Sequence, residues 1–261
     1  MFQVTPIPAF NDNYIWLLAE PQSNRVAVVD PGDATPVLEY LAHNDLTLAA
    51  ILITHHHQDH TGGVARLLET FPVPVYGPRP SPFGGIDHPL QDSDSLELFG
   101  QRLQIREIPA HTLDHISYYC APRTADEAPQ LFCGDTLFLA GCGRLFEGSA
   151  HQLQQAMDYF AGLPDSTEVY CTHEYSLANL AFAAAVEPDN VHIQSAIKRC
   201  KALRADAKPT LPSHIGTEKN INPFMRTRTD TVKASACQHA GSALETPVEV
   251  MTVIRQWKNQ Y

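Results

Sequence analysis

The feature that most constrains the fold of this chain is an apolar run that leads directly into a group of imidazole and carboxylate side chains. The segment AAILIT is typical of a buried β-strand, and THHHQDHTGG follows from Thr54. Because alternate side chains of an extended segment share a face, His55 and His57 can hold one metal ion together. The sequence therefore predicts a metal site at the end of a buried strand.

Two further donors, Asp59 and His60, follow where the chain turns into a helix. They are expected to point away from the first pair and toward a second ion, and the glycines after them allow a tight turn close to the metals. His56 and Gln58 fall between the donors and receive no metal role. A solvated loop that happens to be rich in histidine is the alternative. Four donors in six residues after a buried strand weigh against it.

One segment cannot complete two coordination spheres, so further donors are needed downstream. His111 follows the strand-like run RLQIREIP, Asp135 ends QLFCGD and His173 follows TEVYCT. A single histidine or aspartate at a strand end is more often a cap or turn residue. Three of them after apolar strands make coincidence a poor explanation.

The seven donors divide into two metal sites that share one carboxylate: His55, His57 and His111 in the first, Asp59, His60 and His173 in the second, and Asp135 between them. Imidazole and carboxylate without thiolate suit zinc, iron or manganese and leave room for a solvent molecule. We therefore expect two divalent metal ions per chain. Zinc is the first choice, with iron or manganese as alternatives.

Composition narrows the class of protein. A chain of 261 residues with 44% hydrophobic and 18% charged residues can form one large domain or two modest ones, which excludes a fibre, a coiled coil and a disordered tail. No apolar run is long enough to cross a membrane, and the start lacks the features of a signal peptide. The six cysteines form no CxxC pair, which argues against a disulfide framework. We expect a cytoplasmic protein and take it to be a monomer.

Charge is distributed unevenly along the chain. Residues 190–261 carry 11 basic and 5 acidic side chains, whereas residues 1–189 carry 7 basic and 24 acidic ones. Two oppositely charged lobes that dock on each other would explain this, and so would a cationic pocket for an anionic small molecule. Both interpretations stay open. The net charge of −11 disfavours binding to nucleic acid, which normally requires a basic face.

The first 170 residues alternate β-rich runs with helical stretches. Strands are expected at residues 14–20, 25–30, 49–54, 73–78, 95–99, 102–109, 115–120, 130–135 and 167–172. Helices are expected at residues 34–44, 63–71 and 150–163. Mixed strands and helices with several hairpin-length connections indicate an α+β fold with two sheets and helices packed outside them.

Helical periodicity dominates after residue 172. It covers residues 177–188, 190–207, 230–240 and 247–260, separated by segments that contain proline and glycine. We therefore predict two domains, residues 1–170 and a helical domain at residues 171–261. The boundary is open by several residues because His173 and Tyr175 lie at the junction.

The motifs THHHQDHTGG, PAHT, CGDTLF, GCGRLFEG and CTHEYSLANL, in this order, resemble the metallo-β-lactamase superfamily. Within it the chain is most similar to the bacterial hydroxyacylglutathione hydrolase, or glyoxalase II, family. IPAFNDNYIW, VVDPGD, NPFMR and the last helix extend the similarity along the whole chain. The resemblance implies an αβ/βα sandwich with two metals at one edge, covered by C-terminal helices. It also implies that the same seven side chains are the ligands.

The resemblance further implies a thioester hydrolase. Its substrate would be an S-(2-hydroxyacyl)glutathione such as S-D-lactoylglutathione, cleaved to glutathione and D-lactate in the second step of methylglyoxal detoxification. A hydroxide shared by the two metals would attack the thioester carbonyl, and the thiolate would leave. Asp59 would orient this nucleophile, and Asp59 and Asp135 are therefore the expected catalytic residues. The expected partner is the glutathione thioester, and we expect the protein to bind neither nucleic acid nor a membrane.

Substrate recognition requires cations for the glutathione carboxylates. By position in the family motifs, the resemblance assigns this role to Arg144, Tyr175, Arg255 and Lys258. Arg255 and Lys258 are three residues apart and share a helix face, although an ordinary solvated face would show the same spacing.

Two positions depart from relatives. Ala110 stands where the family usually has glycine, and Phe146 replaces a tyrosine and loses its hydroxyl.

Four other functions are compatible with parts of the pattern. An iron persulfide dioxygenase of the same fold uses one metal, and the complete second donor set weighs against it. An RNA-processing nuclease needs a basic surface that the acidic first 189 residues lack. A periplasmic β-lactamase is disfavoured by the missing signal segment. A metal-binding or interaction module without catalysis would hold the ligands but leave no position open for solvent.

Overall fold

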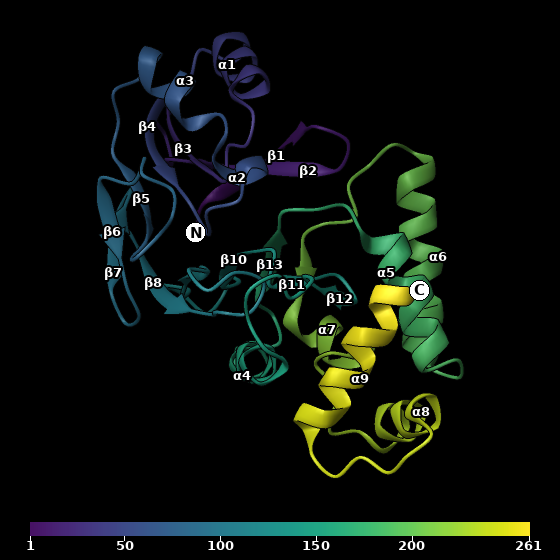
Figure 1. Ribbon diagram of the computed structural model, residues 1–261. Coiled ribbons are helices and arrows are strands. Elements are labelled where there is room, and N and C mark those ends of the chain that lie inside the picture. Colours follow the sequence, from purple (N-terminus) through teal and green to yellow (C-terminus); the bar gives the residue numbers. More distant parts are fainter. The chain divides into compact units, whose positions relative to one another are not determined.

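The computed structural model describes residues 1–261, which form two compact units (Figure 1). The first unit comprises Met1–Glu107 and Asp114–Gly134, and the second comprises Ile108–Leu113 and Asp135–Tyr261. The chain therefore enters the second unit briefly at residues 108–113 and returns to it for good after residue 134. This division in packing does not test the domain boundary expected near residue 170, which stays a prediction.

The first unit contains a six-stranded sheet in which the strands follow one another in chain order. The strands are β1 (Gln3–Ala9), β2 (Asn13–Ala19), β3 (Arg25–Val29), β4 (Thr47–Leu52), β5 (Val75–Pro78) and β6 (His88–Leu90). The pairs β1–β2 and β2–β3 are antiparallel, whereas β3 to β6 run parallel. Parallel neighbours need crossover connections, and here α1 (Ala34–His43) and α3 (Val64–Thr70) supply two of them.

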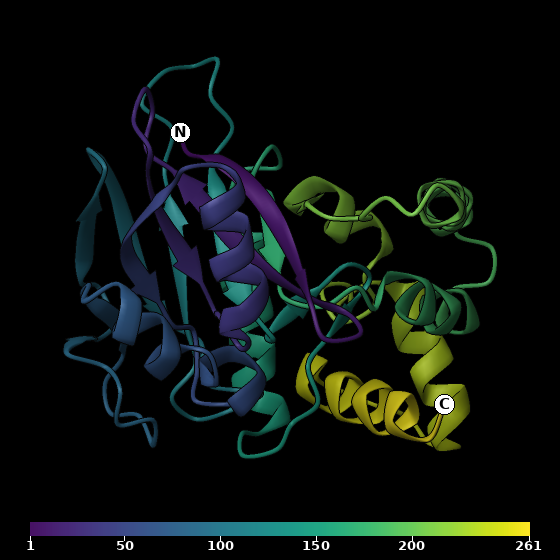
Figure 2. The same ribbon diagram turned by 90° about the horizontal axis from the view of Figure 1, so that it is seen from above.

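The helices α1 and α3 cover one face of this sheet, and Figure 2 shows α1 lying along it. Val37 and Leu41 of α1 and Leu67 of α3 join the alternate strand residues in one apolar core, and each of these three is at most 1% exposed. Burial of each such side chain contributes about 1.5–3 kcal/mol. Asp33 caps α1, because its carboxylate accepts a hydrogen bond from the Thr35 amide at 2.8 Å.

Four strands of a second six-stranded sheet belong to the first unit. They are β7 (Ser95–Leu98), β8 (Gln101–Glu107), β9 (Ile116–Cys120) and β10 (Gln130–Gly134), which pair antiparallel with β9 between β8 and β10. The Tyr118 hydroxyl of β9 donates a hydrogen bond of 2.7 Å to the carbonyl of Ile53, just beyond β4. The buried faces of the two sheets are thereby fixed to each other next to the histidine segment.

The second unit is mainly helical. Its helices are α4 (Ala150–Ala161), α5 (Ser176–Val186), α6 (Val191–Ala205), α7 (Ile215–Ile221), α8 (Asp230–Ala240) and α9 (Pro247–Gln260). Two short strand pairs accompany them: β11 (Leu137–Phe138) with β12 (Gly141–Cys142), and β13 (Glu168–Cys171) with β14 (Ser213–His214). Helix α9 packs against α4 and α8.

The sequence explains where α9 begins and which face it buries. Thr246 and Glu249 form a capping box, in which each side chain accepts a hydrogen bond from the other residue's backbone amide. Val250 and Ile254, four residues apart, turn inward and are fully buried.

The expected helices and strands are present, with ends that agree within two residues. The elements that were not expected are strands β1, β6 and β14, the hairpin β11–β12, the one-turn helix α2 (Gln58–Thr61) and helix α7. Strand β1 contains Pro6 and Pro8, which are tolerated because β1 is the edge strand of its sheet. All six cysteines are free, as expected, and five of them are buried. None of the helices is long and apolar enough to span a membrane.

Candidate metal centre

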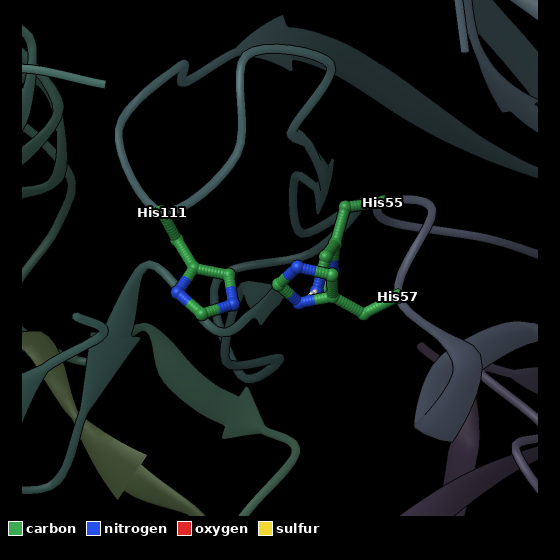
Figure 3. Close-up of side chains that lie close together, drawn as sticks. All are labelled: His55, His57 and His111. Atoms are coloured by element: carbon green, nitrogen blue, oxygen red, sulfur yellow. Dashed lines mark hydrogen bonds between the residues drawn. The ribbon is translucent and has the colours of Figure 1, made fainter. Parts of the chain in front are cut away.

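The first group of predicted donors belongs to the first unit, directly after β4. The ring nitrogens His55 Nε2 and His57 Nδ1 lie 3.1 Å apart, and Figure 3 shows the two rings beside each other. His55 is fully buried. Its other ring nitrogen lies 3.0 Å from the Thr54 hydroxyl. Its ring also stacks on that of His115, so its orientation is fixed by neighbours on several sides.

The other two donors of this segment lie beside the first pair. The rings of His55 and His60 have centroids 4.0 Å apart, and His60 Nε2 lies 3.5 Å from Asp59 Oδ2. His60 is fully buried, whereas the Asp59 side chain is 42% exposed. The Asn13 amide donates a hydrogen bond of 3.2 Å to Asp59 Oδ2. One carboxylate of this segment is therefore open to solvent and held by a neutral donor.

Asp30 contacts the histidine segment and is not among the residues that the sequence singled out. It follows β3, the parallel neighbour of β4, and is buried with a φ of 52°. It accepts hydrogen bonds from the amide and hydroxyl of Thr54, each at 2.7 Å, and lies 3.0 Å from His60 Nδ1. A carboxylate on Nδ1 fixes the histidine tautomer and leaves the Nε2 lone pair available to a metal. The strand-end rule used for His111 would have found it.

The second group of predicted donors belongs to the second unit. His111, which is also drawn in Figure 3, stands on the loop between β8 and β9. Its Nε2 lies 3.5 Å from Asp135 Oδ2, and the Nε2 of His173 lies 3.2 Å from the same oxygen. All three side chains are buried. A carboxylate oxygen thus lies between two imidazoles that come from distant points of the chain.

The tautomer of His111 shows why a cation fits this group. Its Nδ1 lies 2.8 Å from the carbonyl oxygen of Arg144, which can only accept, so Nδ1 carries a proton. In the neutral ring Nε2 then presents a lone pair to Asp135, and a lone pair and a carboxylate oxygen repel each other unless a cation lies between them. Imidazole and carboxylate donors without a nearby thiolate suit a divalent ion such as zinc.

The predicted substrate-binding residues all belong to the second unit. Arg144 is exposed, and Tyr175 is 38% exposed with its ring stacked on His173, at 4.6 Å between centroids. Lys258 donates a hydrogen bond to the carbonyl of Ala178 at 3.2 Å, and its ammonium lies over the Phe182 ring. Burial, followed by the field of the neighbouring Arg255, lowers the pKa of Lys258.

Arg255 differs from the other three because it is buried and holds backbone. Its guanidinium donates hydrogen bonds to the carbonyls of Cys142 and Gly143, at 2.9 and 3.4 Å, and to the Asn259 side chain at 3.1 Å. The side chain is 6% exposed. In this arrangement Arg255 supports the segment that directly precedes Arg144.

The two departures from relatives are accommodated. Ala110 is buried, and its backbone pairs with Thr112 and Gly148 through hydrogen bonds of 3.1 and 3.0 Å. A side chain at position 148 would meet the Ala110 carbonyl at 2.3 Å, so glycine is required on the facing segment instead. Phe146 is 62% exposed, and its ring packs edge-on against His111.

Comparisons with known proteins show the family of the chain. Residues 10–173 match the family model described as "Metallo-beta-lactamase superfamily", and residues 174–261 match "Hydroxyacylglutathione hydrolase C-terminus". The chain is 49% identical to the hydroxyacylglutathione hydrolase of Pseudomonas aeruginosa over 262 residues, covering 100% of both chains. The enzyme of that name from Hahella chejuensis is also 49% identical, again over the full length of both chains.

The chain belongs to the hydroxyacylglutathione hydrolase family. It is therefore a hydrolase, and the resemblance drawn from its motifs is confirmed. All seven predicted donors lie in residues 10–173, which match the superfamily model. Tyr175, Arg255 and Lys258 lie in residues 174–261, which match the C-terminal model. The His and Asp side chains of both groups are suited to hold divalent metal ions.

Solved structures confirm the predicted fold. ETHE1 from Myxococcus xanthus has a TM-score of 0.66 and 21% identity, with 98% of this chain and 91% of that chain covered. The BLEG-1 B3 metallo-beta-lactamase has a TM-score of 0.56 and 28% identity, with 66% of this chain and 91% of that chain covered. The architecture is thus the metallo-β-lactamase fold with a C-terminal helical region.

Proposed function

We propose that this protein hydrolyses S-(2-hydroxyacyl)glutathione thioesters, such as S-D-lactoylglutathione, to glutathione and a 2-hydroxy acid such as D-lactate. This is the second step of the glyoxalase pathway that removes methylglyoxal. The observation that carries the proposal is the 49% identity, over the full length of both chains, with relatives named hydroxyacylglutathione hydrolase.

The seven donors hold two divalent metal ions in this proposal, zinc in the first place and iron or manganese as alternatives. His55, His57 and His111 would hold one ion, Asp59, His60 and His173 would hold the other, and Asp135 would be available to both. When bound, such ions lower the pKa of water to about 7 and polarise a carbonyl group. Asp30 and the Arg144 carbonyl keep the Nδ1 protons of His60 and His111 in place, which leaves both Nε2 atoms free to bind metal.

Asp59 and Asp135 are the catalytic carboxylates in this proposal. Asp59 is the more exposed of the two, and the Asn13 amide fixes one of its oxygens. Asp59 can therefore accept a hydrogen bond from the attacking water and orient it toward the thioester carbonyl. Asp135 is buried between His111 and His173 and serves as the shared ligand.

Arg144, Tyr175, Arg255 and Lys258 bind the glutathione part of the substrate in this proposal. Arg144 and Tyr175 are accessible, and Lys258 offers an ammonium for a carboxylate. Arg255 contributes through the Cys142 and Gly143 carbonyls, which it fixes next to Arg144.

Two properties of the whole protein accompany the proposal. Six free cysteines fit the reducing conditions of the cytoplasm, where we place the protein. The monomeric state stays a prediction that gel filtration of the purified protein can check.

Hydrolysis of S-D-lactoylglutathione by the metal-loaded protein tests the proposed function. Release of free thiol is followed for the wild-type protein, for His57→Ala and for Asp135→Ala, with metal content measured in each sample. We expect thiol release by the wild type and very little by either variant. Near-normal turnover by either variant, with metals verified absent, would show that the reaction needs no metal. A single iron per chain together with oxygen uptake on glutathione persulfide would point to the dioxygenase instead.

A further inference from the structure

The hairpin β11–β12 separates Asp135 from Arg144 in the sequence, and it is too short to be stable by itself. Each of its strands has two residues, and residues 136–143 are all buried. Isolated hairpins are marginal even when they are longer. Buried backbone groups need hydrogen-bond partners, and two strands of two residues cannot provide all of them. Other elements therefore have to supply the remaining partners.

Four side chains from the helical part of the second unit hydrogen-bond to this backbone, and we call them the hairpin cradle: Asn179 of α5, Glu218 of α7, Asn222 after α7 and Arg255 of α9. Asn179 donates to the Leu139 carbonyl at 3.2 Å, and Glu218 accepts from the Ala140 amide at 2.8 Å.

Asn222 contacts the hairpin backbone twice through one amide nitrogen. Its amide nitrogen donates to the carbonyls of Phe138 and Gly141, at 3.2 and 2.9 Å. The same nitrogen lies 3.0 Å from a carboxylate oxygen of Glu218. Its amide oxygen accepts from the Phe224 amide at 3.1 Å, which fixes the direction in which the nitrogen points. This asparagine opens the NPFMR motif, for which the proposed reaction gives no role.

Glu218 is fully buried although it has no part in the proposed chemistry. The Ser213 hydroxyl donates to Oε1 of Glu218, the carboxylate oxygen that does not contact the Ala140 amide. Burial raises the pKa of Glu218 to about 7. Glu218 and Asn222 form a buried polar pair whose hydrogen bonds are satisfied by the hairpin backbone. Any displacement of the hairpin would leave one of these buried groups unpaired, so the pair favours one arrangement of the backbone.

The far end of the hairpin lies against two of the proposed metal ligands. A Cβ atom at Gly143 would lie 2.0 Å from the Asp135 carbonyl oxygen and 2.9 Å from His111 Nδ1. The next carbonyl, that of Arg144, is the group that holds His111 Nδ1 at 2.8 Å. A shift of the hairpin therefore moves the Asp135 backbone and the acceptor that orients His111 at the same time.

We propose that Glu218 and Asn222 are positioning residues that fix Asp135 and His111 in metal-binding geometry through the hairpin β11–β12. The inference rests on the proposed function in one respect, because it takes these two side chains as metal ligands. Neither Glu218 nor Asn222 contacts a ligand directly, so both act through the backbone of residues 138–143.

The variant Asn222→Asp tests this inference with little change of shape. Aspartate keeps the acceptor for the Phe224 amide but removes the N–H groups that hold the Phe138 and Gly141 carbonyls. Zinc affinity is measured by competition with a chromogenic chelator, together with kcat, KM and the melting temperature. We expect zinc to bind about 10- to 100-fold more weakly, the range typical of outer-shell partners, and kcat to fall. Asn220→Asp, at an exposed position two residues earlier, is the matched control and should leave zinc affinity unchanged.

A second pair of variants covers the case in which Asn222→Asp does not fold. Glu218→Gln can keep all three contacts, because its oxygen can accept from the Ala140 amide and from Asn222 while its nitrogen donates to Ser213. Glu218→Ala keeps none of them. We expect Glu218→Ala to lose zinc affinity and Glu218→Gln to restore it.

The outcomes separate this inference from the proposed function. Wild-type zinc affinity and kcat in both Asn222→Asp and Glu218→Ala, with only the melting temperature lowered, would overturn the inference. Failure of the wild-type protein to bind zinc would overturn both proposals. If the zinc affinities follow the expected order but the wild type cleaves no glutathione thioester, the proposed function fails and the inference stands.

Discussion

The two groups of donors are assembled in different ways. In the first unit, His55, His57, Asp59 and His60 come from six consecutive residues after β4, so the local backbone brings their side chains together. In the second unit, the donors are His111, Asp135 and His173, which span more than sixty residues of sequence. They meet only through tertiary contacts. One short segment indicates the local group by itself, whereas the dispersed group needs tertiary supports, and we infer that the hairpin cradle is one of them.

The comparison predicts the same large loss when a ligand is removed from either group. His60→Ala in the first unit and His173→Ala in the second should each lower kcat/KM by more than about 100-fold, the upper end of the losses found for outer-shell partners. The measurement is thiol release from S-D-lactoylglutathione with metal content determined in parallel. The exposed His192→Ala is the control and should behave as the wild type. A normal rate for His173→Ala alone would mean that only the local group takes part.

Asp30 in the first unit orients a proposed metal ligand, His60, and its substitution tests whether such orientation matters there. Asp30→Asn replaces one carboxylate oxygen by an N–H donor, so either the Thr54 amide or the protonated Nδ1 of His60 loses its acceptor. In either orientation the buried contacts that orient His60 are disturbed. We expect zinc to bind about 10- to 100-fold more weakly in a chelator competition. Asp33→Asn is a matched control, because asparagine caps a helix as well as aspartate does. Equal zinc affinities for the two variants would remove Asp30 from the metal centre.

Lys258 tests substrate binding without touching either group of donors. A hydrogen bond to a charged group contributes about 1.5–3 kcal/mol, so Lys258→Ala should raise KM for the glutathione thioester about tenfold or more. Because the side chain does not contact a proposed ligand, kcat should stay within about twofold of the wild type. Steady-state kinetics gives both constants. A KM equal to that of the wild type would show that another group binds the glutathione carboxylates.

Glu218 gives a prediction of a different kind, about stability as a function of pH. Its pKa rises from 4.5 to about 7 on folding because of burial, and Ser213, Ala140, Asn222 and the field of Arg199 oppose this rise. Between pH 4.5 and 7 the unfolded chain has lost the proton that the folded protein keeps, so the free energy of unfolding falls as pH increases. The fall amounts to on the order of 3 kcal/mol and levels off above pH 7.

Urea unfolding of the wild type and of Glu218→Gln at several pH values checks this prediction. Glutamine does not titrate, so the difference in unfolding free energy between the two proteins should change across this window and become constant above it. A difference that does not vary with pH would show that Glu218 keeps an ordinary pKa in the folded protein.

Most of the fold could be predicted from the sequence because its elements have strong periodicity. The buried strand before His55 and the capped helix at residues 247–260 are examples. Strand β1 escaped because its two prolines resemble a turn, and they are compatible with a strand only at a sheet edge. Helix α7 escaped because it has seven residues and lies in a segment rich in turn residues.

In the candidate site, too, the residues with a local sequence pattern were mostly predicted and the others were not. The motif after β4 indicated its own donors, and the strand-end positions indicated His111, Asp135 and His173. Asp30 has the same strand-end signal but was not singled out. Asn222 lies in the NPFMR motif, but nothing local indicates what it or Glu218 does, because both hold hairpin backbone about 80 residues away in the sequence.

Zinc titration of the metal-free protein, with hydrolysis of S-D-lactoylglutathione followed at each addition, tests whether two bound metal ions are needed for the reaction. We expect no thiol release without zinc and a rate that rises until two equivalents per chain are bound. Thiol release at the full rate by the metal-free protein, or a fully zinc-loaded protein that releases none, would contradict this expectation.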